Sequence, residues 1–157
     1  MAWGFAMNVR LIDTTIMLNL LGVPNRCADK DRVTDEFNEA IRNGDTLILP
    51  IATIIESGNE IAKIKGSLRH DIAERFSMLL QKTADDEAPW SCASFEIGSA
   101  ELRHYAEHYT ESAIHGVGMG DLSIIHTFEK CIRLLPIGTI MIWSTDEHLS
   151  SYKCKKV

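Results

Sequence analysis

The sequence lacks the cysteine spacing that is typical of a disulfide framework or a zinc finger. No Cys-x-x-Cys pair occurs among its four cysteines, which are Cys27, Cys92, Cys131 and Cys154. It also lacks a long apolar run, since no stretch approaches the roughly 20 apolar residues of a membrane span. Its apolar start is broken by Arg10 and Asp13 and has no small-residue cleavage site, which argues against a signal peptide. These absences predict a cytoplasmic protein with reduced thiols and no membrane partner.

An excess of positive charge is missing as well. The formal net charge is −6, which argues against a protein that binds nucleic acid by bulk electrostatic attraction. It does not exclude a nuclease, because bound divalent cations make an acidic site attractive to phosphate. The length of 157 residues predicts a single domain over residues 1–157, long enough to bury roughly 70% of its unfolded surface.

Short apolar runs alternate with amphipathic stretches along the chain. The runs predict strands over residues 9–12, 46–49, 90–95 and 138–143. Apolar residues at helical spacing predict helices over residues 14–21, 29–43, 51–65, 67–83, 97–112 and 121–134. Ser67 is expected to cap its helix, and residues 115–120 are expected to form a flexible loop. The alternation predicts an α/β domain with a central, mostly parallel sheet and helices on both faces.

Four acidic residues stand among apolar neighbours. They are Asp13 after the first predicted strand, Glu56 early in the helix after the strand 46–49, Asp121 at the start of a helix, and Asp146 after the last strand. Ligands bind outside the carboxyl ends of the strands in open parallel sheets, and each acid could lie near that edge. The alternative is helix capping for the three aspartates and a solvated helix position for Glu56.

A metal ion gives such a quartet a physical reason. Two unit charges about 4 Å apart repel by ~4 kcal/mol at an effective dielectric of about 20, so converging carboxylates would take up protons or separate. Mg²⁺ or Mn²⁺ removes that repulsion and prefers oxygen ligands. It can also activate water to attack a phosphodiester.

Four segments of the chain carry these acids: residues 11–18, 54–56, 120–125 and 143–146. In this order and spacing they resemble the PIN domain, the ribonuclease fold of many bacterial toxins of the VapC type. The resemblance implies a PIN-like three-layer sandwich that cleaves single-stranded RNA with one or two Mg²⁺ or Mn²⁺ ions. It implies that the metal ligands are Asp13, Glu56, Asp121 and Asp146. It further implies that a small antitoxin protein neutralises the chain and that the chain forms a homodimer.

Three hydroxyl residues lie beside these acids. The family usually has asparagine two residues after the first aspartate, whereas this chain has Thr15. Ser144 fits the hydroxyl residue that the last motif of the family expects. We expect Thr15, Ser144 and Thr145 to orient metal ligands or water.

Polar and basic residues follow Glu56 along the chain. Asn59 and Lys63 come at helical spacings, and Lys65, Arg69 and His70 complete the densest basic run. We expect Asn59, Lys63, Lys65 and Arg69 to contact RNA phosphates, and the lysines at 153, 155 and 156 to form a basic tail. The alternative is a solvated helix face.

Two other functions fit parts of the sequence. The pattern His104-x-x-Glu107-His108 matches inverted zinc peptidases, and two histidines four residues apart on a helix can hold zinc. The surrounding charges favour a solvated helix face for this segment. The third hypothesis is a non-catalytic PIN-like interaction module. The presence of carboxylates at all four positions argues against it.

Overall fold

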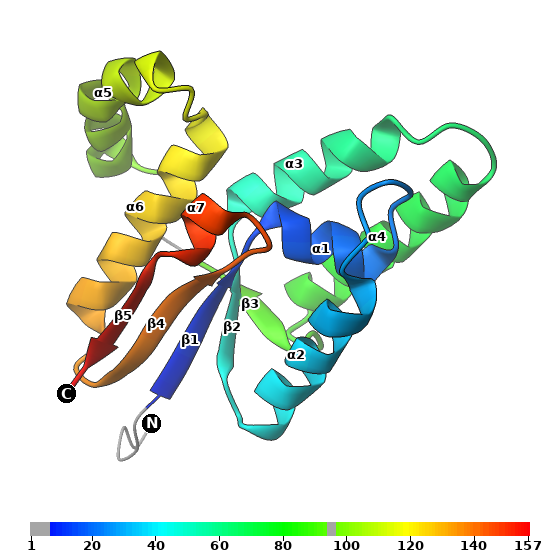
Figure 1. The fold of residues 1–157 in the computed structure, drawn as a ribbon, viewed down its shortest axis with the longest axis horizontal. Helices are drawn as coiled ribbons and strands as arrows, with labels where there is room; N and C mark the ends of the chain where they lie inside the picture. Colours follow the sequence, from blue (N-terminus) through cyan, green and yellow to red (C-terminus); the bar gives the residue numbers. More distant parts are fainter. Residues whose placement is uncertain (1–6, 94–96) are drawn as a thin grey trace.

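A computed structural model describes residues 7–93 and 97–157, and in this part of the chain five strands form one sheet (Figure 1). The strands are β1 (Met7–Ile12), β2 (Thr46–Leu49), β3 (Trp90–Cys92), β4 (Gly138–Trp143) and β5 (Lys153–Lys156). Their order across the sheet is β3-β2-β1-β4-β5. The three pairs β1 with β2, β1 with β4 and β2 with β3 are parallel, and only β5 runs antiparallel to its neighbour. The predicted mostly parallel sheet is therefore confirmed.

Seven helices lie within the same described ranges. They are α1 (Thr14–Leu21), α2 (Lys30–Arg42), α3 (Ile51–Ala62), α4 (Leu68–Ala84), α5 (Ser99–Ile114), α6 (Met119–Leu134) and α7 (Glu147–Ser150). None of these helices is long and apolar enough to cross a membrane. No disulfide joins the four cysteines, all of which lie in the described ranges, as their spacing predicted.

Several predicted boundaries were wrong. Helix α6 begins at Met119, two residues before the predicted start at Asp121, so Gly120 is helical and not part of a loop. Helix α3 ends at Ala62, short of the predicted end. Ser67 precedes α4, but its side chain makes no capping hydrogen bond in the structure as described. The predicted strand 90–95 ends at Cys92, and residues 94–96 lie outside the described residues.

Helix α1 has chemically defined ends. At its start, the carboxylate of Asp13 accepts a hydrogen bond from the backbone N–H of Thr15, as an N-cap does. At its end, Gly22 adopts the left-handed conformation with φ of 70°, which glycine reaches without steric cost. These two residues confine α1 to the stretch directly after β1.

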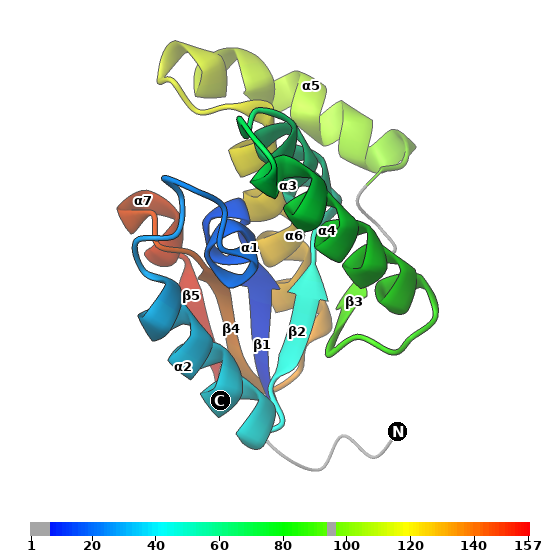
Figure 2. The same ribbon diagram turned by 90° about the vertical axis from the view of Figure 1, so that its right-hand side faces the viewer.

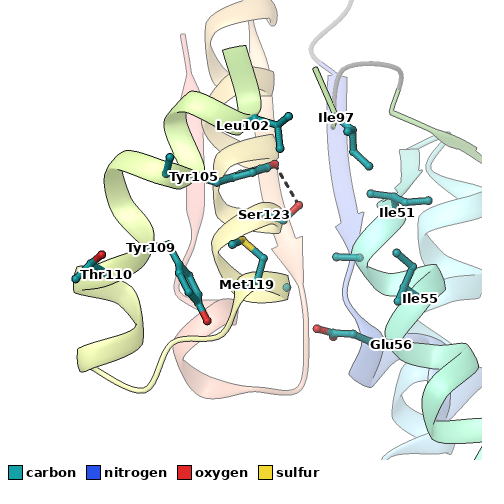
Figure 3. Close-up of a pocket in the computed structure, with 13 residues that line it drawn as sticks. Ile51, Ile55, Glu56, Ile97, Leu102, Tyr105, Tyr109, Thr110, Met119 and Ser123 are labelled. Carbon is teal, nitrogen blue, oxygen red and sulfur yellow. Dashed lines mark hydrogen bonds between the residues drawn. The ribbon is translucent and has the colours of Figure 1, made fainter. Parts of the chain in front are cut away.

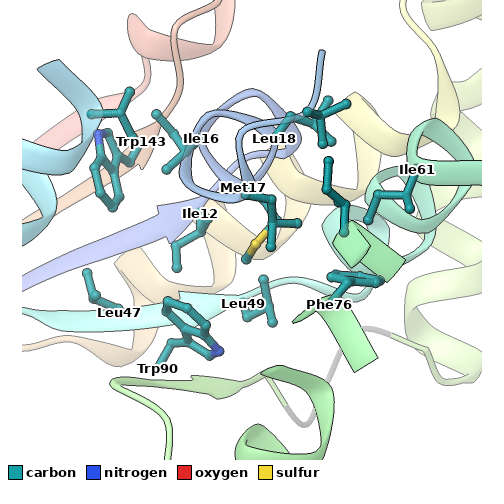
Figure 4. Close-up of a cluster of buried hydrophobic side chains, with 14 of the residues drawn as sticks. Ile12, Ile16, Met17, Leu18, Leu47, Leu49, Ile61, Phe76, Trp90 and Trp143 are labelled. Carbon is teal, nitrogen blue, oxygen red and sulfur yellow. The ribbon is translucent and has the colours of Figure 1, made fainter. Parts of the chain in front are cut away.

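The core has two parts, one on each face of the sheet. Adjacent residues of β1 point in opposite directions: Ile12 packs under α1, α2 and α4, and Leu11 packs under α6. Figure 4 shows Ile12 and Met17 meeting Leu49 and Trp90 on the first face. In Figure 2 the sheet stands between α1 and α2 in front and α6 behind. Helices therefore cover both faces, as predicted, and β1 is buried on both sides as a central parallel strand should be.

Strand β5 corrects the prediction of a basic tail. Its residues pair antiparallel with β4, and Lys156 lies opposite Gly138 at the amino end of that strand. The ammonium of Lys156 donates a hydrogen bond to the carbonyl of Ile132, 2.6 Å away. These lysines thus form the edge of the sheet, where charge discourages pairing with another chain. They extend away from the carboxyl end of β4, where Ser144 and Asp146 follow.

Candidate metal centre

The strand order reverses direction beside β1. From β1 the chain moves outward to β2 and β3, then returns through α5 and α6 to place β4 on the other side of β1. Ligands of open α/β sheets bind in the crevice that such a reversal leaves outside the strand ends. Asp13 follows β1 there, and its N–H donates to the carbonyl of Trp143, 3.0 Å away, at the end of β4. The topology therefore brings the segments after β1 and β4 together.

The four acids predicted from the sequence line one cleft of about 400 Å³, which we call the acidic cleft. They come from four separate segments: the residue after β1, the middle of α3, the first turn of α6 and the residue before α7. The cleft is lined by Asp13, Thr14, Thr15, Arg26, Glu56, Asn59, Glu60, Lys63, Asp121, Asp146 and Leu149. The sequence prediction that these carboxylates lie close together is thus matched by their positions.

The charges in the cleft disfavour ionisation of Asp121. Burial raises the pKa of Asp121 above its ordinary value of 3.8, and the negative charges of Asp13, Glu56 and Asp146 raise this pKa further. His148 opposes them with a smaller effect. The cleft therefore holds negative charge at a free-energy cost that a bound cation would relieve.

Asp13 is the most constrained of the four acids, with only 6% of its surface exposed. Its Oδ2 accepts hydrogen bonds from the hydroxyls of Thr15 at 2.8 Å and Ser144 at 2.7 Å. The backbone N–H of Thr15 points at the same oxygen from 3.4 Å. Among the described residues no hydrogen bond uses Oδ1. One oxygen is thus held in place and the other is left for a ligand.

The two hydroxyls are oriented by backbone donors. Thr15 Oγ1 accepts from the N–H of Thr145 at 3.0 Å, and Ser144 Oγ accepts from the N–H of Asp146 at 2.9 Å. Each hydroxyl has one proton, so each is set to donate it to Asp13. Thr15, which stands where the resemblance expects asparagine, therefore links Asp13 to the loop after β4. Thr145 takes part through its backbone N–H.

Glu56 is positioned by two residues that the sequence did not single out for this role. The hydroxyl of Thr14 donates to its Oε2 at 2.9 Å. On the other side, a Cβ added to Gly120 would collide with Glu56 Oε1. Gly120 therefore lets the first turn of α6 approach α3 closely. Gly120 directly precedes Asp121 in the sequence, but the predicted flexible loop over residues 115–120 concealed this role.

Helix capping and ligand binding are compatible in this cleft. Asp13 caps α1, and Asp146 caps α7 through a bond from the N–H of Leu149 to its Oδ2 at 2.9 Å. Each cap uses one carboxylate oxygen. Asp121 is different, because it lies within the first turn of α6 and the preceding N-cap position is Gly118. Capping alone does not explain why all three aspartates face the same cleft.

The structure does not bring all the predicted phosphate-binding residues to one site. Asn59 and Lys63 line the acidic cleft, whereas Lys65 lines a neighbouring hollow of about 440 Å³. Arg69, on the first turn of α4, lines neither hollow within the described chain. Arg26, from the turn after α1, lines both and was not predicted because an isolated arginine in a turn carries no pattern.

One carboxylate holds the basic side chains at the rim of the cleft. Glu60 accepts from Arg26 at 2.9 Å and from Lys63 at 2.8 Å. The hydrogen bond from Lys63 lowers the pKa of Glu60, although burial acts against it. Both cations keep much of their surface exposed, so they remain available to an anionic ligand. Exposed ion pairs of this kind add little stability. Here they position the two cations at the rim of the cleft.

An apolar groove of about 580 Å³ borders the acidic cleft (Figure 3). Ile51 and Ile55 of α3 form one wall, and Tyr105 of α5 and Met119 of α6 form the other. Glu56 lies at its edge and belongs to both hollows. The acidic cleft therefore has an apolar surface on one side and a basic rim on the other.

The predicted peptidase pattern lies elsewhere. His104, Glu107 and His108 are on α5, and none of them lines the acidic cleft. His108 Nδ1 is 2.8 Å from the carbonyl of His104, and His104 stacks between the rings of His108 and His126. That peptidase pattern requires His104 and His108 as joint ligands. In the described structure, His104 instead has its ligand atom near those of His126 and Glu129.

No protein-family model matches the sequence, and no curated protein matches it.

Proposed function

We propose that the protein is a metal-dependent endoribonuclease with a PIN-like fold, which cleaves single-stranded RNA with Mg²⁺ or Mn²⁺. The observation that carries this proposal is the convergence of four carboxylates, from four segments far apart in the chain, on one cleft. Resemblance of the four motifs to the toxin ribonucleases adds the substrate class. The proposed metal ligands are Asp13, Glu56, Asp121 and Asp146.

The donor set fits a hard divalent cation. The cleft offers carboxylate oxygens and no cysteine or histidine among its lining residues. Mg²⁺ and Mn²⁺ prefer such oxygens, whereas zinc sites are typically built with imidazole or thiolate ligands. The raised pKa of Asp121 is the expected effect of converging acids, and the charge of a bound cation would oppose it.

The residues of the chain divide the remaining work. Thr15 and Ser144 hold Asp13 through one oxygen, and Thr14 holds Glu56. Lys63 and Arg26 at the rim would contact the phosphates of an RNA strand lying across the cleft. A bound cation would supply positive charge to the scissile phosphodiester and activate water for attack. The antitoxin and the homodimer that the resemblance implies remain part of the proposal.

Labelled single-stranded RNA and DNA, each incubated with the wild-type protein, test this function. We expect Mn²⁺ or Mg²⁺ to support RNA cleavage, and we expect EDTA to stop it. Cleavage of DNA alone would change the substrate class. If neither is cleaved with either metal, the protein is a non-catalytic module and the proposal fails.

A further inference from the structure

A second cluster of ligand-type side chains lies between α5 and α6. The ring of His104 on α5 stacks on the ring of His126 on α6, with centroids 3.9 Å apart and an interplanar angle of 24°. The opposite side of His104 stacks on His108 at 4.2 Å. Tyr105 meets His126 edge-on at 5.4 Å. Imidazole side chains are therefore concentrated at this helix interface.

His126 is buried without hydrogen-bond partners. Only 5% of its surface is exposed, and neither Nδ1 nor Nε2 has a partner among the described residues. A buried polar group left in this state costs roughly 1–3 kcal/mol, so native structures rarely keep one without a reason. A metal ion bound to one ring nitrogen would remove part of this cost.

The surroundings of His126 keep its imidazole neutral. Burial lowers its pKa below 6.5, and the neighbouring His104 lowers it further. Arg133 and His108 act in the same direction, and Glu129 opposes them. Neutral imidazole is the form that donates a lone pair to a metal.

A third ligand completes the cluster. One ligand atom from each of His104, His126 and Glu129 lies within 4.8 Å of the other two. Ligands about 2.1 Å from one ion at tetrahedral angles are about 3.4 Å apart, so binding requires a contraction of roughly an ångström. Because a metal binds in the plane of an imidazole ring, binding also requires His104 to turn out of its stack on His126 until both ring nitrogens point at one ion. His104 is half-buried and Glu129 is exposed, so both side chains can make this adjustment and an ion can reach the site.

We propose that His104, His126 and Glu129 bind a borderline transition-metal ion of the Zn²⁺ class at the α5–α6 interface. Two imidazole nitrogens and one carboxylate form a ligand set that suits Zn²⁺ and not Mg²⁺. The site uses His104 of the peptidase pattern, but its second histidine comes from α6 and not from position 108. It shares no residue with the acidic cleft.

The ion would join α5 to the helix that carries Asp121. In Figure 2, α5 lies beyond the end of the sheet, and its contacts are chiefly with α6. His126 lies 5 positions after Asp121 on the same helix. A metal bridge between α5 and α6 would therefore hold α5 in place without touching the acidic cleft. This role does not depend on ribonuclease activity.

Calorimetric titration with Zn²⁺ tests the site. The titration uses the full chain with Asp13→Asn and excess Mg²⁺, so that the acidic cleft contributes little. We expect one Zn²⁺ per chain, and we expect Co²⁺ in its place to give the visible absorption of an imidazole-bound ion. His104→Ala and Glu129→Gln should each weaken Zn²⁺ binding tenfold or more. These two variants replace accessible side chains, so folding is less at risk than with His126→Ala.

Two matched controls define the outcome. His115→Ala removes an exposed histidine of the same region. Like His108, His115 has its Nδ1 close to the carbonyl four residues earlier, and its removal should leave the affinity for Zn²⁺ unchanged. His70→Ala removes a member of the fully exposed group His70, Asp71 and Glu74, and it should also have no effect. Absence of Zn²⁺ binding, or binding that His104→Ala and Glu129→Gln leave intact, would overturn the proposal. Loss of binding on His70→Ala would overturn it as well.

Discussion

Helix α6 carries residues of two ligand clusters, Asp121 in its first turn and His126 with Glu129 farther along. The acidic cleft gathers oxygen donors at the carboxyl edge of the sheet, and the histidine cluster gathers nitrogen donors between two helices. Burial disfavours charge in both places, but the consequences are opposite. It raises the pKa of Asp121, which favours the protonated carboxyl, and lowers the pKa of His126, which favours the neutral imidazole.

This contrast shows how one physical effect would suit the two proposed sites to different ions. The acids need a cation to become fully ionised together, so their site depends on charge neutralisation. The lowered pKa of His126 favours its neutral form, whose ring nitrogen suits a Lewis acid with a preference for nitrogen. The predictions below test whether the two clusters are as separate in function as they are in chemistry.

The largest effect is expected from Asp121→Asn. This change removes one carboxylate from the acidic cleft and should lower RNA cleavage about a thousandfold, since bound metal supplies several kcal/mol of charge stabilisation. Single-turnover cleavage in Mn²⁺ measures it. Asp31→Asn is the matched control, because Asp31 is exposed and also lies in the first turn of a helix. Equal activity of the two variants would remove Asp121 from the site.

Gly120→Ala is expected to have the next largest effect. The added Cβ would meet Glu56 Oε1, so the Glu56 side chain must move from its position in the cleft. A displacement of about 1 Å at a catalytic group can cost about a hundredfold in rate, and we expect a loss of this order. Gly118→Ala is the control, because nothing lies within 4 Å of a Cβ at that position. Equal rates for both variants would show that the close approach of α6 to Glu56 has no functional role.

Ser144→Ala is expected to have a smaller effect on metal affinity. It removes a hydrogen bond of 2.7 Å that holds Asp13 Oδ2 and leaves the carboxylate itself in place. Loss of such a supporting bond typically weakens metal binding by about tenfold or more. Titration with Mn²⁺ measures the change. Ser151→Ala should bind like the wild type, because the hydroxyl of Ser151 donates to the carbonyl of His148 and not to Asp13.

The smallest effect concerns stability without metal. The raised folded-state pKa of Asp121 stabilises the fold only at low pH, and this contribution is lost as the pH rises through that pKa. In EDTA, Asp121→Asn should therefore melt at a higher temperature than the wild type near pH 7. The gap should narrow as the pH falls towards 3.8, the ordinary pKa of aspartate. Melting curves that rank the wild type above Asp121→Asn at neutral pH would contradict this reasoning.

Much of the acidic cleft was predictable because its residues follow strands. Asp13 directly follows one apolar run and Asp146 lies three residues after another, and parallel strands end at a common edge, so their proximity follows from local pattern. The loop prediction for Gly120 was wrong because a glycine that follows two others at alternate positions is typical of a loop, whereas α6 begins at Met119. Its role depends on the position of Glu56 in another helix, which no local pattern contains.

The histidine cluster and β5 were not predictable for a related reason. His126 occupies an ordinary place in an apolar helix pattern, and its partner His104 is on a different helix. The lysine-rich segment of β5 has no strand pattern of its own, and it becomes a strand by pairing with β4. In both cases tertiary contact decides the outcome, whereas the sequence reports only local periodicity.

The most direct test of the metal centre is the change in melting temperature that Mn²⁺ produces in the wild type and in Asp13→Asn. At about a hundred times Kd, binding stabilises the fold by ~2.7 kcal/mol, which corresponds to a rise of roughly 5–10 °C for a chain of this size. We expect this rise in the wild type and in His104→Ala, and little or none in Asp13→Asn. A wild type that Mn²⁺ does not stabilise, or an Asp13→Asn variant that it stabilises equally, would contradict the assignment of the acidic cleft.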